Sequence, residues 1–518
     1  MDTFKSINKL LLLLVFLIFS NSQILLAASQ EHCCEKKTPL ELSSSTGLSD
    51  EELAWYLNEI EKDTAVLTNN RDVLGRVSPK QLQSAIEQLG FTHFTHLYPV
   101  ILKGEELPDL LGKENSSISI MAVRGGVLKP VPTQIDEFDS SLGWVYISGK
   151  SPAPIKGAQG IFDAEDELAF MFRDTGREPY DIKSMNAVKG EIVKEMVFED
   201  ANALKRYAYI VVGNDQKSKA DYVSFDIDRQ KVSTTFYNLS YEPESFIAFK
   251  DFKAHVGSAQ DQTIVDNIRV DIGASVLAKW ARVNLNSSDN IKIEILGVKD
   301  GDVRALALAK LKILIAGIQI FSLYTQVNIY DQGIIIPNRT ELGSARYFAN
   351  AIKNPAVRVT LDFVDLQGAL VSAEAIYDTM GVGVVDGVMT AEEIKANKSD
   401  LPGEWVWMDS KQGWDVFMSI VLPKEMIEGM ITALIYEDDP NSVNDYENMP
   451  GAHPRIGIRT AGLPDAIDQF HEFELLISLW FPDTVGDGGP AVFNKEVKSP
   501  PSLVINDFNL ETIAAVAK

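Results

Sequence analysis

Two acidic segments in the first third of the chain carry the residues best suited to chemistry. The first ends a strand-like stretch with Gln134, Asp136 and Glu137, and the second begins another with Asp166 and Glu167. If the two stretches pair, a carboxylate of one comes close to a carboxylate of the other. Such a pair suits glycoside hydrolysis, at about 5 Å for retention or about 6.5 to 9.5 Å for inversion. It equally suits a hard cation such as Ca²⁺, and strand ends also collect solvated acids without any function.

The four carboxylates are therefore the candidate catalytic residues if the chain is an enzyme. Gln134, on the same stretch, is a candidate ligand-binding residue. Arg173 follows the second segment and is either a further ligand-binding residue or the cation that neutralises one of the acids.

The two segments give the chain a resemblance to a loose group of exported, β-rich proteins. These carry a Pro-x-Gln-x-Asp-Glu strand, here residues 132–137, followed by an Asp-Glu-Leu strand, here residues 166–168. The resemblance covers about a tenth of the chain. It implies no established activity, and no catalytic residue is carried over from it.

Trp405 and Trp407 are the aromatic candidates for ligand binding. They share one face of a strand-like stretch, because side chains two residues apart in a strand point the same way. An exposed pair of indoles would stack on sugar rings, whereas a buried pair would belong to the core.

An acidic loop after residue 436 is the candidate cation site. Its oxygen donors are dense enough to wrap a Ca²⁺ ion, and the candidate ligands are Asp438, Asp439, Asn441 and Asp445. The alternative is a solvated surface loop. The stretch 381–393 resembles an EF-hand loop, but Val382 and Val384 stand where acidic ligands belong, so capping of a helix by Thr390 explains it better.

Charge and missing motifs exclude several classes of protein. Lys and Arg total 48 against 73 Asp and Glu, and the net charge of -25 makes nucleic acid an improbable partner. The sequence contains no Gly-x-Ser-x-Gly elbow, Walker loop, dinucleotide-binding fingerprint or His-Glu-x-x-His motif. Serine hydrolases of the usual type, nucleotide hydrolases, nicotinamide enzymes and dedicated zinc enzymes therefore lose support.

The N-terminus predicts export. Lys5 and Lys9 precede a short apolar run, and small residues suitable for cleavage stand at 27–29. We expect a signal peptide over 1–29, no transmembrane span in the mature chain, and a periplasmic, cell-surface or secreted location. The two cysteines, Cys33 and Cys34, are adjacent and cannot staple the fold.

The rest of the pattern is mainly β. After a flexible leader at 30–47, residues 48–94 show helical periodicity, including a helix with Ser78 as its cap. From residue 96 the period becomes two, which is typical of antiparallel sheets with one face in water. Residues 311–330 form an apolar stretch that we interpret as two buried strands joined at Gly317.

We therefore expect a large antiparallel β-sandwich region, either one supersandwich or two sandwiches, with a short α-helical N-terminal segment. The expected modules are 95–250 and 251–500, followed by a tail at 501–518. The leading hypothesis is an exported, non-catalytic binding or surface-associated protein with an extracellular carbohydrate as ligand and Ca²⁺ as a structural ion. The alternatives are a carbohydrate-active hydrolase or lyase, and a structural subunit that binds envelope proteins.

Overall fold

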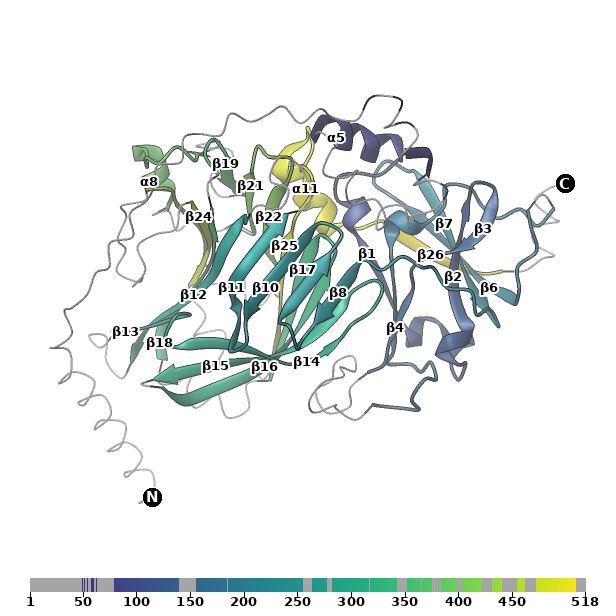
Figure 1. Cartoon of the computed structure of the whole chain (residues 1–518), viewed down its shortest axis with the longest axis horizontal. Helices are drawn as coiled ribbons and strands as arrows, with labels where there is room; N and C mark the ends of the chain where they lie inside the picture. The colour runs from purple at the N-terminus through teal and green to yellow at the C-terminus, as the bar shows by residue number, and fades with distance from the viewer. Residues whose placement is uncertain are drawn as a thin grey trace, which may run out of the picture. The chain divides into compact units, whose positions relative to one another are not determined.

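The alternating segments form antiparallel sheets, and the protein is mainly β with few helices (Figure 1). This computed structural model describes isolated positions between 49 and 62 and then residues 79–138, 155–183, 185–254, 263–276, 282–315, 317–341, 352–364, 366–374, 381, 383–397, 403–421, 431–439, 454–461 and 472–508. All of the described positions belong to one unit, Ser45–Lys518.

The largest sheet has nine strands in the order β14-β15-β16-β17-β25-β22-β21-β19-β20. Its strands are β14 (Ile291–Lys299), β15 (Ala305–Ile315), β16 (Ile318–Tyr330), β17 (Gly333–Glu341), β25 (Glu472–Trp480), β22 (Asp415–Val421), β21 (Trp405–Asp409), β19 (Leu370–Ala373) and β20 (Gly383–Val384). The expected hairpin is confirmed, because β15 and β16 are joined at Gly317, whose φ of 76° needs a residue without a Cβ.

Two further sheets pack against this sheet. The four-stranded sheet, β11-β10-β9-β8, contains β8 (Val223–Asp226), β9 (Lys231–Thr234), β10 (Tyr237–Glu242) and β11 (Ser245–Ala254). The five-stranded sheet, β13-β12-β18-β24-β23, contains β12 (Val265–Val276), β13 (Arg282–Asn286), β18 (Ile352–Phe363), β23 (Ile431–Glu437) and β24 (Arg455–Ala461).

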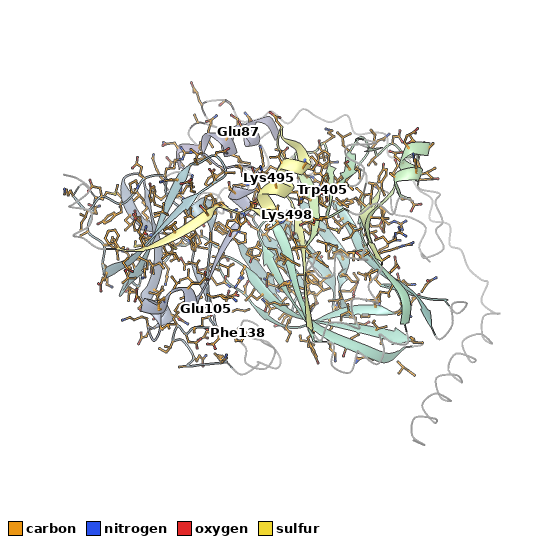
Figure 2. The ribbon with its side chains drawn as sticks, turned by 180° about the vertical axis from the view of Figure 1, so that it is seen from behind. Glu87, Glu105, Phe138, Trp405, Lys495 and Lys498 are labelled. Carbon is orange, nitrogen blue, oxygen red and sulfur yellow. The ribbon has the colours of Figure 1, made fainter. Side chains whose placement is uncertain are left out.

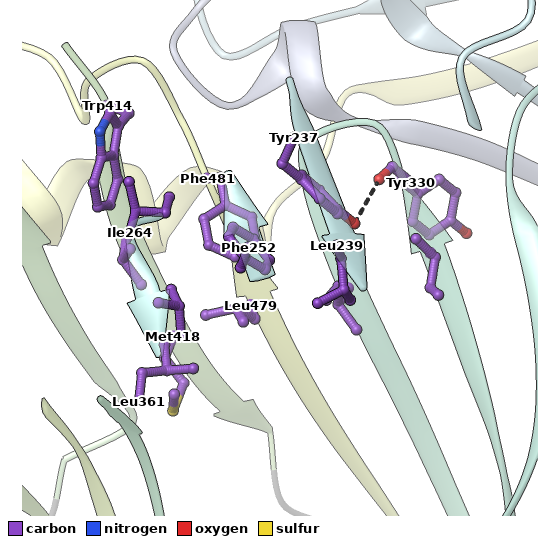
Figure 3. Packing of buried hydrophobic residues seen from close by; sticks show 14 of the residues in the cluster. Tyr237, Leu239, Phe252, Ile264, Tyr330, Leu361, Trp414, Met418, Leu479 and Phe481 are labelled. Atoms are coloured by element: carbon purple, nitrogen blue, oxygen red, sulfur yellow. Dashed lines mark hydrogen bonds between the residues drawn. The ribbon is translucent and has the colours of Figure 1, made fainter. Parts of the chain in front are cut away.

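One cluster of buried hydrophobic side chains joins these three sheets into a β-sandwich. Figure 3 shows Tyr237 and Phe252 of the four-stranded sheet packed near Phe481 and Leu479, and the rings of Tyr237 and Phe252 are stacked with centroids 4.9 Å apart. The Tyr237 hydroxyl donates a hydrogen bond of 3.4 Å to the carbonyl oxygen of Tyr330 (Figure 3). Residue 250 lies inside β11, and the division into two modules stays a prediction.

The N-terminal part adds a five-stranded sheet, β26-β6-β7-β2-β3, and a three-stranded sheet, β1-β5-β4. Their strands are β1 (Pro99–Lys103), β2 (Ile118–Arg124), β3 (Val127–Pro130), β4 (Gln134–Asp136), β5 (Glu167–Met171), β6 (Glu191–Glu199), β7 (Lys205–Val212) and β26 (Ser502–Asp507). Strand β26, in the segment expected to be a tail, pairs with β6, which lies about 300 residues earlier in the sequence.

Strand β5 contributes to two cores because its side chains alternate. Leu168 and Phe170 belong to a second hydrophobic cluster with β1, β2, β6 and β7. Ala169 and Met171 belong to the main cluster. The three-stranded sheet therefore carries the acidic segments between two packed layers.

The helices include α5 (Pro79–Gln88), α8 (Ala391–Asn397) and α11 (Gly489–Lys498). The expected helix near Pro79 is confirmed by α5, whereas most of the helix expected before it lies outside the described residues. Short 3-10 turns include η1 (Thr95–Leu97) and η5 (Phe172–Asp174). Among the described residues, no helix combines the length and apolar character needed to cross a membrane.

One expectation about the sheets is wrong. The alternation of polar and apolar residues after residue 96 predicts that the polar side chains of β12 face water, but Arg269 and Asp271 are only 7% and 8% exposed. Arg269 instead forms an ion pair with the buried carboxylate of Asp362 on the neighbouring strand β18. A cross-strand ion pair replaces part of the solvation that each charge loses on burial.

Candidate functional site

The two acidic segments do pair, as β4 and β5. Their antiparallel register places Asp136 directly opposite Glu167. Arg304, just before β15, lies between the two carboxylates, because its Nη2 donates hydrogen bonds of 2.8 Å to Asp136 Oδ2 and 2.6 Å to Glu167 Oε2. We call Gln134, Asp136, Glu167, Lys299 and Arg304 the arginine cluster.

Both oxygens of Asp136 are fully engaged. Oδ2 accepts hydrogen bonds from Nε and Nη2 of Arg304, at 3.0 and 2.8 Å. Oδ1 lies 2.7 Å from the Lys299 ammonium and accepts a 2.7 Å hydrogen bond from Gln134 Nε2. Burial opposes the charged form of Asp136, but the nearby charges of Arg304 and Lys299 more than offset it and hold the pKa of the carboxyl below its ordinary value.

Arg304 itself is 1% exposed. Burial alone would lower the pKa of its guanidinium, but Tyr330, Asp136 and Glu167 raise that pKa well above the ordinary value. Arg304 Nη1 also donates to the Tyr330 hydroxyl at 3.3 Å. The cluster holds two carboxylates and two cations, so its formal charges balance.

Gln134 positions the backbone that carries Arg304. Its Oε1 accepts hydrogen bonds from the backbone N–H groups of Val303 and Arg304, at 3.2 and 3.0 Å. A Cβ on Gly301 would lie 2.3 Å from this oxygen, so only glycine permits the close approach. Sequence reasoning missed Lys299 and Arg304, since nothing in the local pattern links residues that lie more than 160 positions after Asp136.

Asp166 and Glu137 lie outside the arginine cluster. Asp166 Oδ2 accepts the backbone N–H of Asp163 at 3.0 Å, and Oδ1 accepts that of Phe138 at 3.2 Å. Glu137 accepts a hydrogen bond from the backbone N–H of Gly160. Burial raises the pKa of Asp166 to about 6, although its two backbone hydrogen bonds oppose the shift. Both acids therefore accept hydrogen bonds from backbone N–H groups of neighbouring loops, and neither belongs to the hydrogen-bond network of Asp136.

Arg173 does not neutralise the acidic segments. It lies in η5, directly after β5, and forms an ion pair with Asp331. Its guanidinium carbon lies 4.4 Å from the centre of the Tyr222 ring, and Nη1 donates to the carbonyl oxygen of His96 at 3.4 Å. Burial alone would lower its pKa, but Asp331, Tyr222 and Asp174 raise it above the ordinary value. At 6% exposure, Arg173 offers little surface to a ligand.

Trp405 and Trp407 are buried, at 3% and 8% exposure. Trp405 packs on the Phe417 ring with centroids 5.9 Å apart, and Trp407 Nε1 donates to Asp415 Oδ2 at 2.9 Å. Figure 2 labels Trp405 beside α11, whose Phe493 belongs to the same hydrophobic cluster. The pair shares a strand face as expected, but that face is covered and is not an exposed stacking platform.

The acidic loop is only partly described. Asp438 is buried, and its Oδ2 accepts the backbone N–H groups of Asp386 and Gly387 at 2.8 and 3.0 Å. Asp439 is described, whereas Asn441 and Asp445 lie outside the described residues. Within the described part of the chain, no group of three or more His, Cys, Asp or Glu side chains could hold a metal ion. A calcium site on this loop stays a prediction.

The capping interpretation of the stretch 381–393 is confirmed. Thr390 Oγ1 accepts the backbone N–H of Glu393 at 3.2 Å, and Glu393 Oε2 accepts that of Thr390 at 2.7 Å. Glu393 Oε1 accepts the backbone N–H of Val384 at 3.1 Å. The Thr390–Glu393 pair is a capping box at the start of α8. Together with the Val384 contact, it occupies both oxygens of the carboxylate that an EF-hand would need.

No protein-family profile and no curated protein sequence matches the chain. Among solved structures, an α-mannosidase from Enterococcus faecalis V583 is similar, with a TM-score of 0.40 and 11% identity over 83% of this chain and 49% of that one. A glycosyl hydrolase family 38 protein from Enterococcus faecalis gives a TM-score of 0.38 and 10% identity over 79% and 45%. The chain thus spans about half the length of these proteins, and likeness at this level says nothing of its activity.

Proposed function

We propose that the chain is an exported, non-catalytic binding protein whose ligand is an extracellular carbohydrate. The observation that carries the non-catalytic part is the sharing of Arg304 by Asp136 and Glu167. A general acid must hold a proton near neutral pH, and a general base must reach a substrate proton. Asp136 is fully buried, its pKa is depressed, and both of its oxygens are occupied.

The carbohydrate part has separate support. The N-terminal signal predicts export, which binding of an extracellular carbohydrate requires. Tyr324 on β16 is 44% exposed, and tyrosine rings offer a large flat surface with a polar tip. The proposal includes Ca²⁺ as a structural ion, with Asp438, Asp439, Asn441 and Asp445 as its ligands.

One observation favours the enzymatic alternative. Burial raises the pKa of Asp166 to about 6, and raised carboxyl pKa values are typical of general acids in glycoside hydrolysis. Against this, Asp166 is 0% exposed and both of its oxygens accept backbone N–H groups. The non-catalytic function is therefore better supported.

The test is thermal unfolding of the mature chain with a panel of glycans, each with calcium or with chelator. A ligand at one hundred times its dissociation constant adds about 2.7 kcal/mol and shifts the unfolding midpoint. We expect a shift with at least one glycan and no new reducing ends on long incubation. Reducing ends that disappear in the Asp166→Asn variant would instead establish the enzyme.

A further inference from the structure

A row of lysines lies on one face of the strands β14, β15 and β16. The register aligns Lys292, Lys312 and Ser322 side by side. It aligns Glu294, Lys310 and Tyr324 in the next row. Directly paired residues of an antiparallel sheet point to the same side, and alternate residues return to that side. We call these six residues the lysine face.

The lysine face points away from the main core. The residue between the two β14 positions, Ile293, packs against that core from the opposite side of the sheet. Tyr324 is 44% exposed, and the lysines are partly exposed. The face is built on strands, so its side chains start from fixed positions rather than from a loop.

The charge of this face is opposite to that of the chain. It carries three ammonium groups and one carboxylate, while the whole chain has a net charge of -25. Only Lys312 is paired with Glu294. Lys292 donates to the backbone oxygen of Ser288 at 2.7 Å, and Lys310 lies 5.6 Å from the centre of the Tyr324 ring. Neither has a carboxylate partner among the described residues.

An excess of cations beside an exposed aromatic ring fits one kind of carbohydrate. An ammonium group donates ordinary hydrogen bonds to the hydroxyls of a neutral sugar, but it forms stronger, charge-assisted bonds with the acidic groups of carboxylated or sulfated sugars. The acidity of the whole chain repels polyanions, but screening limits that repulsion to about 8 Å at physiological salt. The charges on the lysine face itself, more than the net charge of the chain, therefore determine which ligands the face attracts.

We propose that the lysine face binds an anionic polysaccharide, with Lys292, Lys310 and Lys312 contacting its acidic groups and Tyr324 packing on a sugar ring. This inference rests on the proposed function, since it names the class of carbohydrate and the surface that takes it. The glutamate on the face orients Lys312 and leaves Lys310 and Lys292 available for the ligand.

The test is binding of the full mature chain to three probes by calorimetry: polygalacturonate, neutral dextran and single-stranded poly(dT). We expect polygalacturonate to bind most tightly and its affinity to fall with salt. The double variant Lys310→Gln/Lys312→Gln should weaken that binding at least about tenfold, which corresponds to about 1.4 kcal/mol. The matched control Lys113→Gln/Lys231→Gln removes two exposed lysines elsewhere and should bind as the wild type does.

Tyrosine variants separate stacking from charge. Tyr324→Phe keeps the ring and should bind normally, whereas Tyr324→Ala should weaken binding without changing the unfolding midpoint. Unchanged polygalacturonate binding in the double lysine variant would overturn the inference. Binding of dextran alone would overturn it while sparing the proposed function, and binding of no glycan would overturn both. Poly(dT) binding through the same lysines as tightly as polygalacturonate would indicate a general polyanion surface and refute the carbohydrate assignment.

Discussion

Arg304 holds Asp136 through two hydrogen bonds to the same carboxylate oxygen, at 3.0 Å from Nε and 2.8 Å from Nη2. The two residues are 168 positions apart in the sequence and are 1% and 0% exposed. Their contact joins β4 of the three-stranded sheet to the start of β15 in the nine-stranded sheet. A charge pair this deeply buried tolerates little change in either partner.

Replacing Arg304 by methionine should be strongly destabilising. Asp136 and Glu167 would lose their shared cation, and breaking a buried pair costs about 3 to 5 kcal/mol. Arg304→Lys should fall between this variant and the wild type, because one ammonium group cannot copy the forked contacts. The measurement is the urea midpoint of unfolding for each variant, with tryptophan fluorescence as the readout. The control is Arg229→Met, since the side chain of Arg229 is 83% exposed and pairs only at the surface. Equal midpoints for Arg304→Met and Arg229→Met would show that the arginine cluster does not stabilise the fold.

The stability that Asp166 contributes, measured against its amide variant, should be greatest in acid. Its folded pKa of about 6 lies above the unfolded value near 4, so the fold favours the protonated form. The contribution is fully present below about pH 4 and is lost as the pH rises through about 6, for a total of about 3 kcal/mol. The measurement is the unfolding midpoint of the wild type and of Asp166→Asn between pH 4 and 7.5. The wild-type advantage should shrink as the pH rises, and two parallel curves would contradict the prediction.

Trp407→Phe should destabilise the nine-stranded sheet without affecting glycan binding. The variant keeps a ring but removes the donor to Asp415, a buried acid whose pKa burial raises well above its ordinary value. Loss of one buried hydrogen bond costs about 1 to 3 kcal/mol. Trp414→Phe is the matched control, because Trp414 is also buried and its Nε1 has no hydrogen-bond partner among the described residues. If Trp407→Phe lost glycan affinity while its stability stayed unchanged, the prediction would be wrong and Trp407 would be a ligand-binding residue.

Gly301→Ala should be more destabilising when Gln134 is present than when it is absent. The added Cβ would meet the Gln134 amide and displace the acceptor of the Val303 and Arg304 N–H groups. Overpacking of this kind costs about 1 to 3 kcal/mol. In a Gln134→Ala background the same substitution should have a smaller effect, so a double-mutant cycle of unfolding free energies measures the coupling. Additive effects would rule out the contact.

Much of the fold could be predicted because its signals are local. The period of two after residue 96 predicted antiparallel strands, and the glycine at 317 located the β15–β16 hairpin. The capping box at Thr390 predicted the start of α8. Helix α11 was missed, since its Gly489 and Pro490 look like a turn when taken without the surface that they pack on. The calcium loop, the signal peptide and the leader lie wholly or partly outside the described residues and stay predictions.

The sequence by itself determined which residues share a face, because strand and helix periodicity depends only on near neighbours. It predicted that Trp405 and Trp407 point the same way and that a carboxylate at 136–137 can meet one at 166–167. Only the tertiary structure decided that the tryptophan face is covered and that Arg304 and Lys299 balance the acids. Burial, and with it the charge state of each carboxylate, is set by side chains that arrive from distant segments, and no local pattern records which segments those are.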